Sequence, residues 1–178
     1  MSSTRPSIAA CLVLHGTVTP PALDADVRNL VDVADEVVVY DTGDHIVPGS
    51  SAFDAVLHPA VTFVSGFWAD DRERAQQAAL AHVGSDWALC VLAGETVTAE
   101  AEELRELLLL AQDVPAMSVR VDDVVRGTHR SARLLHKAMP GASFCGELAE
   151  VPSSVLTVRQ PVATTSRVPR QRGVFDRV

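Results

Sequence analysis

Two short apolar runs constrain the fold of this chain more than any other feature. Residues Ile8–Leu14 (IAACLVL) are apolar throughout, and Glu36–Tyr40 (EVVVY) is nearly so. Strands that are buried on both faces, as in a parallel sheet, read as continuous apolar runs. Between the two runs, from residue 22 to residue 34, apolar side chains recur at helical spacing. The chain therefore begins with a buried strand, a helix and a second buried strand, the unit from which parallel α/β sheets are built.

The pattern of strands and helices changes along the chain. We expect a short helix over 51–57, a strand over 61–64, a helix from a cap at Asp70 or Asp71 to about residue 82, and a strand over 87–93. Thr98 is expected to cap a helix that runs through residue 111. Apolar and polar residues alternate over 117–121, which is typical of an antiparallel strand, and 130–135 and 142–148 are expected to add further strands. This order predicts a mainly parallel sheet flanked by helices, with a mixed or antiparallel extension.

Length and charge suggest one domain followed by an arm. The chain has 178 residues, of which 47% are hydrophobic and 21% charged, the balance of a globular protein. We place the domain at 1–156 and a basic, extended C-terminal arm at 157–178, where five arginines stand against one aspartate in a chain of net charge -8. Such an arm can dock on a protein partner or on a second copy of the chain. A solubilising tail is the alternative. The acidic body argues against nucleic-acid binding as a function.

Cysteine usage and hydropathy indicate where the protein works. Cys11 and Cys90 lie in apolar runs and Cys145 stands far from both, so we expect reduced thiols rather than disulfides or a zinc site. No stretch approaches the length of a membrane span, and the first residues lack the apolar core of a secretion signal. We expect a cytoplasmic protein or a component of a larger assembly such as a virus particle. The alanine-, valine- and arginine-rich composition favours a bacterial or phage genome.

Four blocks of sequence give a more specific indication. They follow one another at characteristic spacing, at residues 10–14 (ACLVL), 34–43 (ADEVVVYDTG), 68–71 (WADD) and 84–89 (GSDWAL). With these blocks, the chain from about Ile8 to Glu150 resembles the family-2 glycosyltransferases of the GT-A fold, particularly the small bacterial type. The resemblance implies a GT-A-like (Rossmann-like) domain and a nucleotide-sugar donor that binds at the carboxyl edge of the sheet.

The resemblance also implies a nucleotide site after the second strand. In the family this strand ends in an aspartate that holds the nucleotide base, and Asp41, Thr42 and Gly43 match that segment. An aspartate that only forms a turn is an equally good interpretation of Asp41. His15 and His45 lie in loops at the same expected edge, where open α/β sheets bind ligands. In place of the Arg-Asn pair that faces the donor in the family, this chain has glutamines at 76 and 77.

The expected metal motif is largely missing. The family ends its fourth strand in Asp-any-Asp, whose carboxylates hold a divalent metal on the donor diphosphate, because such ions require hard oxygen ligands. This chain has Leu-Ala-Gly-Glu at residues 92–95, so Glu95 is the one weak candidate ligand there, with Asp44 as a possible helper. We therefore expect no cofactor. Mn or Mg bound with a nucleotide-sugar is the alternative.

No catalytic residue is identified with certainty by sequence. Candidates for a base are Asp70 and Asp71 before the third expected helix, for which helix capping is the simpler interpretation. A third candidate is Glu150, which ends a segment that matches the family's Gly-x-x-His-Glu without its histidine. Arg133 matches the arginine of a common Arg-Leu-Phe segment.

Two functional hypotheses remain, and a third is less specific. Apolar strand positions and turn glycines match the family, whereas most polar site positions do not. This pattern favours a glycosyltransferase-like domain that has lost catalysis, a pseudoenzyme that serves as a binding or structural and assembly module. The alternative is an active minimal glycosyltransferase that uses a nucleotide-sugar donor, with Asp41 on the base and Glu95 near the diphosphate. The third is an unrelated α/β binding protein.

Overall fold

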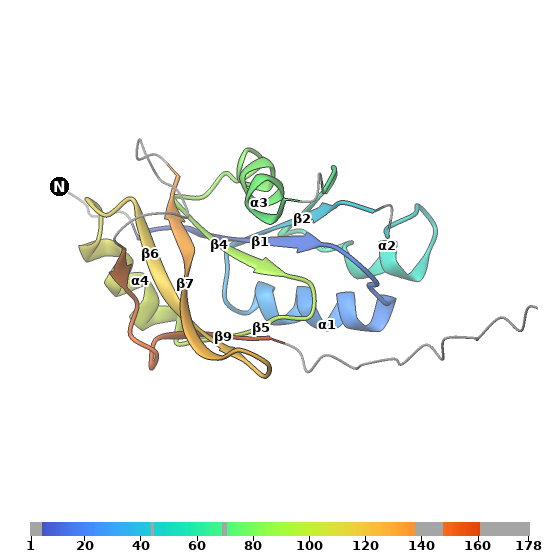
Figure 1. Cartoon of the computed structure of the whole chain (residues 1–178). Helices are drawn as coiled ribbons and strands as arrows, with labels where there is room; N and C mark the ends of the chain where they lie inside the picture. Colours follow the sequence, from blue (N-terminus) through green and yellow to red (C-terminus); the bar gives the residue numbers. More distant parts are fainter. Residues whose placement is uncertain (1–4, 44, 69–70, 138–147, 161–178) are drawn as a thin grey trace, which may run out of the picture.

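The fold is a mixed sheet with helices on both faces, seen in a computed structural model (Figure 1). The structure describes residues 5–43, 45–68, 71–137 and 148–160. Its elements in chain order are β1 (Ile8–Leu14), α1 (Pro20–Val31), β2 (Glu36–Asp41), α2 (Ser51–Ala55), β3 (Val61–Ser65), α3 (Arg72–Leu80), β4 (Trp87–Leu92), β5 (Thr96–Ala99), α4 (Ala101–Leu110), β6 (Ala116–Asp123), β7 (Gly127–His136), β8 (Ala149–Glu150) and β9 (Leu156–Arg159).

The sheet has a parallel half and a mixed half. Its strand order is β3-β2-β1-β4-β7-β6-β9-β5, and β8 pairs with β6 beside β9. Strands β3, β2, β1 and β4 are parallel neighbours. Strand β7 is antiparallel to β4 and to β6, β9 is parallel to β6, and β5 is antiparallel to β9. The predicted fold class, a mainly parallel sheet flanked by helices with a mixed extension, is confirmed.

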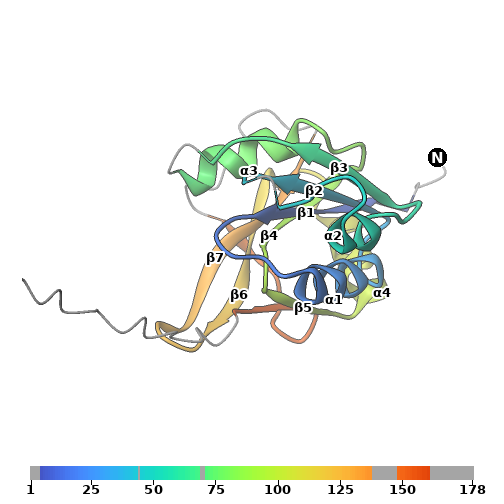
Figure 2. The same ribbon diagram turned by 90° about the vertical axis from the view of Figure 1, so that its right-hand side faces the viewer.

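The mixed half of the sheet curls around α1. Figure 2 shows α3 on one face of the parallel strands, and α1, α2 and α4 on the other, with β5 and β9 beneath α1. Alternate residues of β1 supply the two cores: Ile8, Ala10, Leu12 and Leu14 face the α1 side, whereas Ala9, Cys11 and Val13 face α3. All seven are fully buried. Strand β1 is therefore buried on both faces, as its continuous apolar sequence predicts.

Local signals place most of the helix starts. Two prolines occupy the first turn of α1, where a missing N–H is tolerated. The side chain of Ser50 accepts a hydrogen bond from the Phe53 amide, and that of Asp71 accepts one from the Arg74 amide. The prediction that Asp71 caps a helix is confirmed, and Asp70 lies outside the described residues.

One predicted helix start is wrong. Thr98 lies within β5, and α4 begins three residues later at Ala101, after Glu100. Residues Thr96–Ala99 alternate between exposed and more buried positions and pair along their whole length with β9. Pairing with a strand that is distant in the sequence thus makes this segment a strand, although its local sequence resembles a helix cap.

The end of the domain also differs from its expected place. Residues 157–159 belong to β9, and the amide of Gln160 donates to the carbonyl of Asp122 at 2.9 Å. The boundary drawn between 156 and 157 therefore falls inside a strand, and the domain includes residue 160. The rest of the predicted arm, 161–178, lies outside the described residues, as does most of the strand predicted over 142–148.

Two buried cysteines face each other across neighbouring strands. Cys11 and Cys90 are register partners in β1 and β4, and both are free thiols with no exposed surface. A hydrogen bond with Cys90, together with burial, raises the pKa of the Cys11 thiol well above its usual value. Cys11 is therefore a protonated, unreactive core thiol at neutral pH.

None of the helices in the described parts of the chain has the length and apolar character needed to cross a membrane.

Candidate functional site

The loops that follow β1 and β2 are joined by one histidine. The ring of His45 has its Nδ1 2.6 Å from Oδ1 of Asp41 and its Nε2 2.6 Å from the carbonyl oxygen of Gly16. Both neighbours are acceptors, so both contacts are satisfied when each ring nitrogen carries a proton. The hydroxyl of Thr42 adds a second link, because it donates to the Leu14 carbonyl at 2.6 Å. These bonds hold the two loops together at the carboxyl edge of the sheet.

Asp41 is the centre of this arrangement and is 1% exposed. Its carboxylate accepts hydrogen bonds from the amides of Gly43 and Ile46, at 3.1 and 2.9 Å, as well as from His45. Burial alone would raise the pKa of Asp41, but the bonds from His45, Ile46 and Gly43 outweigh it and lower the pKa. Asp41 is therefore ionised at neutral pH and already satisfied by the protein.

The predicted nucleotide-binding segment ranges from buried Asp41 to exposed Gly43. Thr42 is half-buried, and Gly43 lies beneath His45, where a Cβ would come 2.6 Å from the ring carbon Cε1. The prediction that Asp41, Thr42 and Gly43 bind a nucleotide stays a prediction. All three residues already take part in hydrogen bonds within the protein. The importance of His45 follows from its position at this edge, which the sequence indicated, but its two partners could not be read from spacing.

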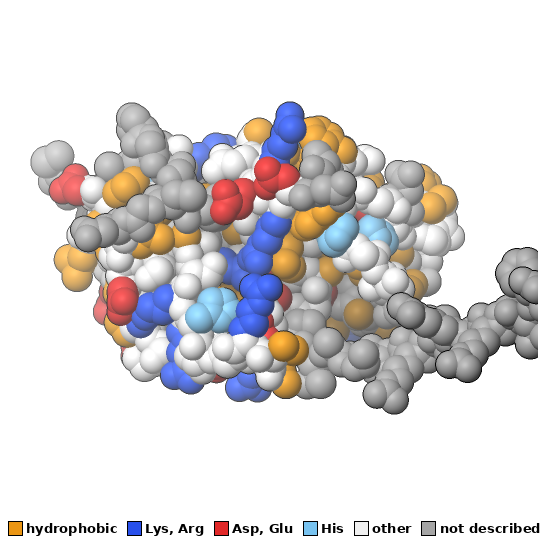
Figure 3. All heavy atoms as spheres, in the orientation of Figure 1, with side chains coloured by type: hydrophobic (Ala, Val, Ile, Leu, Met, Phe, Trp, Pro, Cys, Tyr) orange, Lys and Arg blue, Asp and Glu red, His pale blue; other side chains and the backbone are white. Residues whose placement is uncertain are grey.

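A second aromatic contact lies at the same edge. The ring of His15 stacks on Trp68, with centroids 3.6 Å apart and planes 13° from parallel. His15 is exposed and Trp68 half-buried. Nearby, the guanidinium of Arg74 lies over the ring of Phe67, 6.0 Å from its centroid. Figure 3 shows histidine side chains and a line of basic side chains on this face of the molecule.

The turn between β4 and β5 stands where the metal motif was expected. The amide of Glu95 donates to the carbonyl of Leu92 at 3.0 Å, which closes a four-residue turn. Gly94 sits in this turn with φ +82°, a conformation that favours glycine. Its amide donates to the carboxylate of Asp26 on α1 at 2.8 Å. The side chains of Leu92, Ala93 and Gly94 offer no ligand oxygen.

Glu95 is the remaining acid of the turn, and it is committed to a buried ion pair. Its Oε1 accepts from Nη2 of Arg133 at 2.8 Å, and its Oε2 accepts from the amide of Leu92 at 2.8 Å. The side chains are 1% (Arg133) and 2% (Glu95) exposed. Gln160 adds a longer bond to Oε1 at 3.3 Å, and Arg133 also donates to the Cys90 carbonyl at 3.0 Å. Arg133 therefore anchors β7 to the end of β4.

The described residues at this edge do not fit a divalent metal on a diphosphate. A metal of that kind needs several free anionic oxygens. The turn supplies Glu95 alone, and the guanidinium of Arg133 occupies the oxygen that faces it. No group of three or more histidine, cysteine, aspartate or glutamate side chains with metal-binding geometry occurs among the residues that the structure describes. Asp44, the suggested helper, lies outside them.

The candidate bases are occupied or outside the described residues. Asp70 is outside. Asp71 accepts the amide hydrogen of Arg74 at 3.1 Å and is exposed. Glu150 lies 3.1 Å from Nε of Arg130, in β8, which is separated from β4 by β6 and β7. The catalytic role of all three remains a prediction.

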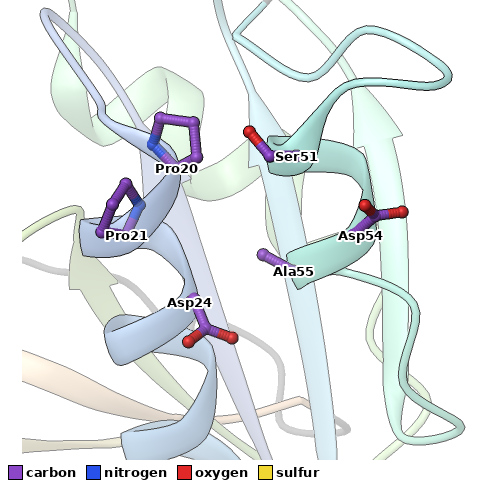
Figure 4. Close-up of a pocket in the computed structure, with 6 residues that line it drawn as sticks. All are labelled: Pro20, Pro21, Asp24, Ser51, Asp54 and Ala55. Atoms are coloured by element: carbon purple, nitrogen blue, oxygen red, sulfur yellow. The ribbon is translucent and has the colours of Figure 1, made fainter.

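A hollow of about 500 Å³ lies between α1 and α2. Figure 4 shows its lining residues: Pro20, Pro21, Asp24, Ser51, Asp54 and Ala55. Asp54 turns away from α1 in this view. Asp24 already pairs with Arg28 at 2.8 Å. The two carboxylates therefore do not converge on one point.

Asp26 was not identified from the sequence, although it interrupts the apolar face of α1. Burial raises its pKa to about 6, the Gly94 amide opposes this, and the charge of Glu95 adds to it. The raised value means that ionising Asp26 above pH 6 costs folding free energy. Well below pH 4 the group is protonated in both the folded and the unfolded chain, so it no longer affects stability.

We expect Asp26→Asn to stabilise the protein at neutral pH. Its amide oxygen can still accept from Gly94, while the buried charge is removed. The free energy of unfolding should rise by about 1–3 kcal/mol at pH 7.5, and the gain should shrink as the pH falls through 6 to 4.5. Urea unfolding at both pH values measures this, with exposed Asp32→Asn as the control. A loss of stability at pH 7.5 would contradict the assignment.

Comparison with known proteins identifies the fold. No protein-family model and no curated protein sequence matches the chain. Among solved structures, S. aureus TarS (residues 1–349) superposes with a TM-score of 0.60 at 9% identity, over 87% of this chain and 60% of TarS. A Pyrobaculum calidifontis mannosyltransferase, solved with GDP-Man and Mn2+, gives a TM-score of 0.59 at 17% identity, over 92% of this chain and 59% of the enzyme. TarS has also been solved with UDP-GlcNAc.

The chain therefore has the fold of GT-A-type glycosyltransferases, and it spans about 60% of the length of these enzymes. At such low identity the likeness concerns the fold.

Proposed function

We propose that this chain is a glycosyltransferase-like domain that has lost metal-dependent sugar transfer and serves as a binding module. The observation that carries the proposal is the turn between β4 and β5. Its Gly94 has a positive φ, and its single acid, Glu95, lies in a buried ion pair with Arg133. The turn at the end of β4 thus connects this strand to β7 through Arg133 and to α1 through Asp26.

The chemistry of sugar transfer explains why this turn matters. A divalent metal, when bound to a donor diphosphate, stabilises the charge that develops on the leaving group. Side chains that hold such an ion must present free oxygens. Here the equivalent positions contribute packing and a salt bridge instead, which supports loss of the metal-dependent reaction.

The loop bridge of Asp41, His45 and Gly16 supports the same proposal. A carboxylate that holds a nucleotide base must have an oxygen available to it. Both oxygens of Asp41 already accept hydrogen bonds from protein groups. These hydrogen bonds stabilise the loops at the carboxyl edge of the sheet. The stack of exposed His15 on half-buried Trp68 lies beside them.

The C-terminal segment 161–178 is proposed as the part that contacts a protein partner or a second copy of the chain. It contains four of the chain's arginines, and the net charge of the whole chain is -8. A basic segment of this kind suits an acidic surface. Strand β9 attaches it to the sheet just ahead of residue 161.

The experiment is to incubate the purified chain with UDP-, GDP- and TDP-sugars, with and without Mn2+. We expect no release of nucleoside diphosphate above the buffer rate, measured by chromatography, and no increase in donor affinity on adding Mn2+, measured by calorimetry. A metal-dependent glycosyltransferase run in parallel is the positive control. Turnover, or binding that requires Mn2+, would instead support the alternative, an active minimal glycosyltransferase. This alternative is worth testing because one structural neighbour was solved with GDP-Man and Mn2+ and another with UDP-GlcNAc.

A further inference from the structure

A small cavity lies between the start of α3 and strand β7. It has a volume of about 140 Å³ and is lined by Arg72, Glu73 and Gln76 from α3 and by Ser131 and Ala132 from β7. Two of these side chains, Arg72 and Gln76, have polar groups that no described part of the protein satisfies. The cavity therefore has hydrogen-bonding capacity in excess of what the described residues use.

Gln76 provides the clearest sign of a missing partner. It is 2% exposed, and its Nε2 is buried without a hydrogen-bond partner among the described residues. Buried side-chain nitrogen atoms are nearly always paired, because leaving one unpaired costs free energy. An amide NH2 group is a donor, so the missing partner is an acceptor.

Arg72 provides a positive charge at the same cavity. It forms no ion pair within the described part of the chain, although it is half-buried. Burial lowers its pKa, and the charge of Arg133 lowers it further, with a smaller contribution from Arg126 and an opposing one from Glu95. Arg72 thus supplies the cavity with one positive charge that no described residue pairs, while the neighbouring charge of Arg133 is neutralised by Glu95. Figure 3 shows the line of basic side chains on this face.

A third unsatisfied donor belongs to Arg133, the residue after Ala132, which lines the cavity from β7. The Nε of Arg133 is buried without a partner among the described residues, although the two terminal nitrogens of this guanidinium are bonded to Cys90 and Glu95. Ser131 lines the cavity from β7. The N-terminus of α3, nine residues long, adds the positive end of its dipole.

Glu73 is the one acid in the lining, and it is exposed. Because water and salt screen its charge, the Glu73 carboxylate repels a bound anion only weakly. It is also an acceptor, which suits a ligand that carries hydroxyl groups beside its charge.

We propose that this cavity binds a phosphate-class oxyanion, a phosphate or pyrophosphate group, without a metal ion. Arg72 supplies the charge, and Gln76 and Ser131 supply hydrogen bonds to the phosphate oxygens. The proposal deepens the proposed function and rests on it, since it names the ligand class of a binding module whose metal motif has become a structural turn. The phosphate group can be free or part of a nucleoside diphosphate.

The test is calorimetric titration of the whole chain with inorganic phosphate, pyrophosphate, UDP and GDP, in EDTA to remove metal ions. We expect pyrophosphate to bind in EDTA. Arg72→Gln should weaken that binding about tenfold or more, since it removes a charge-assisted contact. The matched control is Arg74→Gln, which removes the same charge from the same turn but from a side chain over Phe67, and it should change affinity less than threefold.

Gln76→Met separates ligand binding from folding. The replacement has similar volume and removes the unpaired donor, so the unfolding midpoint in urea should stay the same or rise, while pyrophosphate affinity falls several-fold. Gln77→Met, at the exposed neighbouring position, should leave both unchanged. Affinity for UDP or GDP well above that for pyrophosphate would identify a nucleotide as the source of the phosphate, and equal affinities would identify free phosphate.

The proposal is overturned if no phosphate compound binds at 10 mM in EDTA, a concentration of roughly the weakest Kd that such a contact would give. It is also overturned if binding is unaffected by both Arg72→Gln and Gln76→Met, or if it requires Mn2+. These outcomes are distinct from failure of the proposed function, which is shown by sugar turnover. A chain that neither binds pyrophosphate nor turns over a donor leaves the loss of catalysis intact and removes the anion site alone.

Discussion

Replacing Glu95 by glutamine is expected to lower the free energy of unfolding by about 3–5 kcal/mol, the range for breaking a buried ion pair. Glu95 accepts from Arg133 with one oxygen and from the Leu92 amide with the other. A glutamine must therefore turn its NH2 group toward one of these two donors. It also leaves the guanidinium of Arg133 buried beside a neutral group. Urea unfolding followed by circular dichroism measures the loss.

A double variant tests whether the lost stability comes from the unpaired charge of Arg133 or from a steric effect of the new glutamine. Arg133→Met in the Glu95→Gln background removes the unpaired charge, so it should restore at least about 2 kcal/mol. The control is Arg28→Met, which breaks an ion pair with Asp24 whose partners are 77% and 41% exposed. It should change stability by about 0.5 kcal/mol or less. If Glu95→Gln and Arg28→Met cost the same, the buried pair does not stabilise the turn.

Gly66→Ala is expected to cost about 2–4 kcal/mol, because the added methyl group has no space. A Cβ at Gly66 would overlap the ring of Tyr40, which is 3% exposed and packed between α3 and the sheet. The Tyr40 hydroxyl accepts from the Phe67 amide at 3.3 Å, and the Gly66 amide donates to the Asp41 carbonyl at 2.8 Å. Moving the ring would therefore disturb the end of β2 as well.

Gly84→Ala is the matched control for this prediction. A Cβ there would meet the Glu36 carboxylate at 3.4 Å, an ordinary contact. Thermal unfolding of the two variants side by side should show a lower midpoint for Gly66→Ala alone. A midpoint for Gly66→Ala within a degree of the native protein would mean that Tyr40 has an alternative position.

The sequence predicted the parallel half of the fold well because its signals are local. Burial on two faces makes β1 and β2 apolar throughout, and the caps of α2 and α3 act within three residues. Strand β5 shows the limit of such signals. Thr96–Ala99 is short and polar on one side, and its partner β9 lies about sixty residues later. Nothing near Thr98 in the sequence indicates that partner.

The candidate site was less predictable for a related reason. The sequence identified Asp41, Glu95 and Arg133 one by one, but whether a carboxylate is free or satisfied depends on contacts between distant segments. Glu95 and Arg133 meet because β7 lies beside β4. The cavity behind Arg72 likewise depends on α3 crossing the sheet, so its unpaired Gln76 amide looks like any other helical glutamine in the sequence.

The position of β9 has a consequence for how the protein is made. Among the described strands, β5 forms its ladder with β9 alone, and β9 also covers one edge of β6. A ribosome releases β5 and β6 long before it releases β9, so both strands present open edges to the cell while synthesis continues. The sheet closes only when residue 160 has emerged. A chain interrupted ahead of that point would keep two unpaired strand edges that can bind other chains, so translation past residue 160 is a condition for the protein to remain unaggregated.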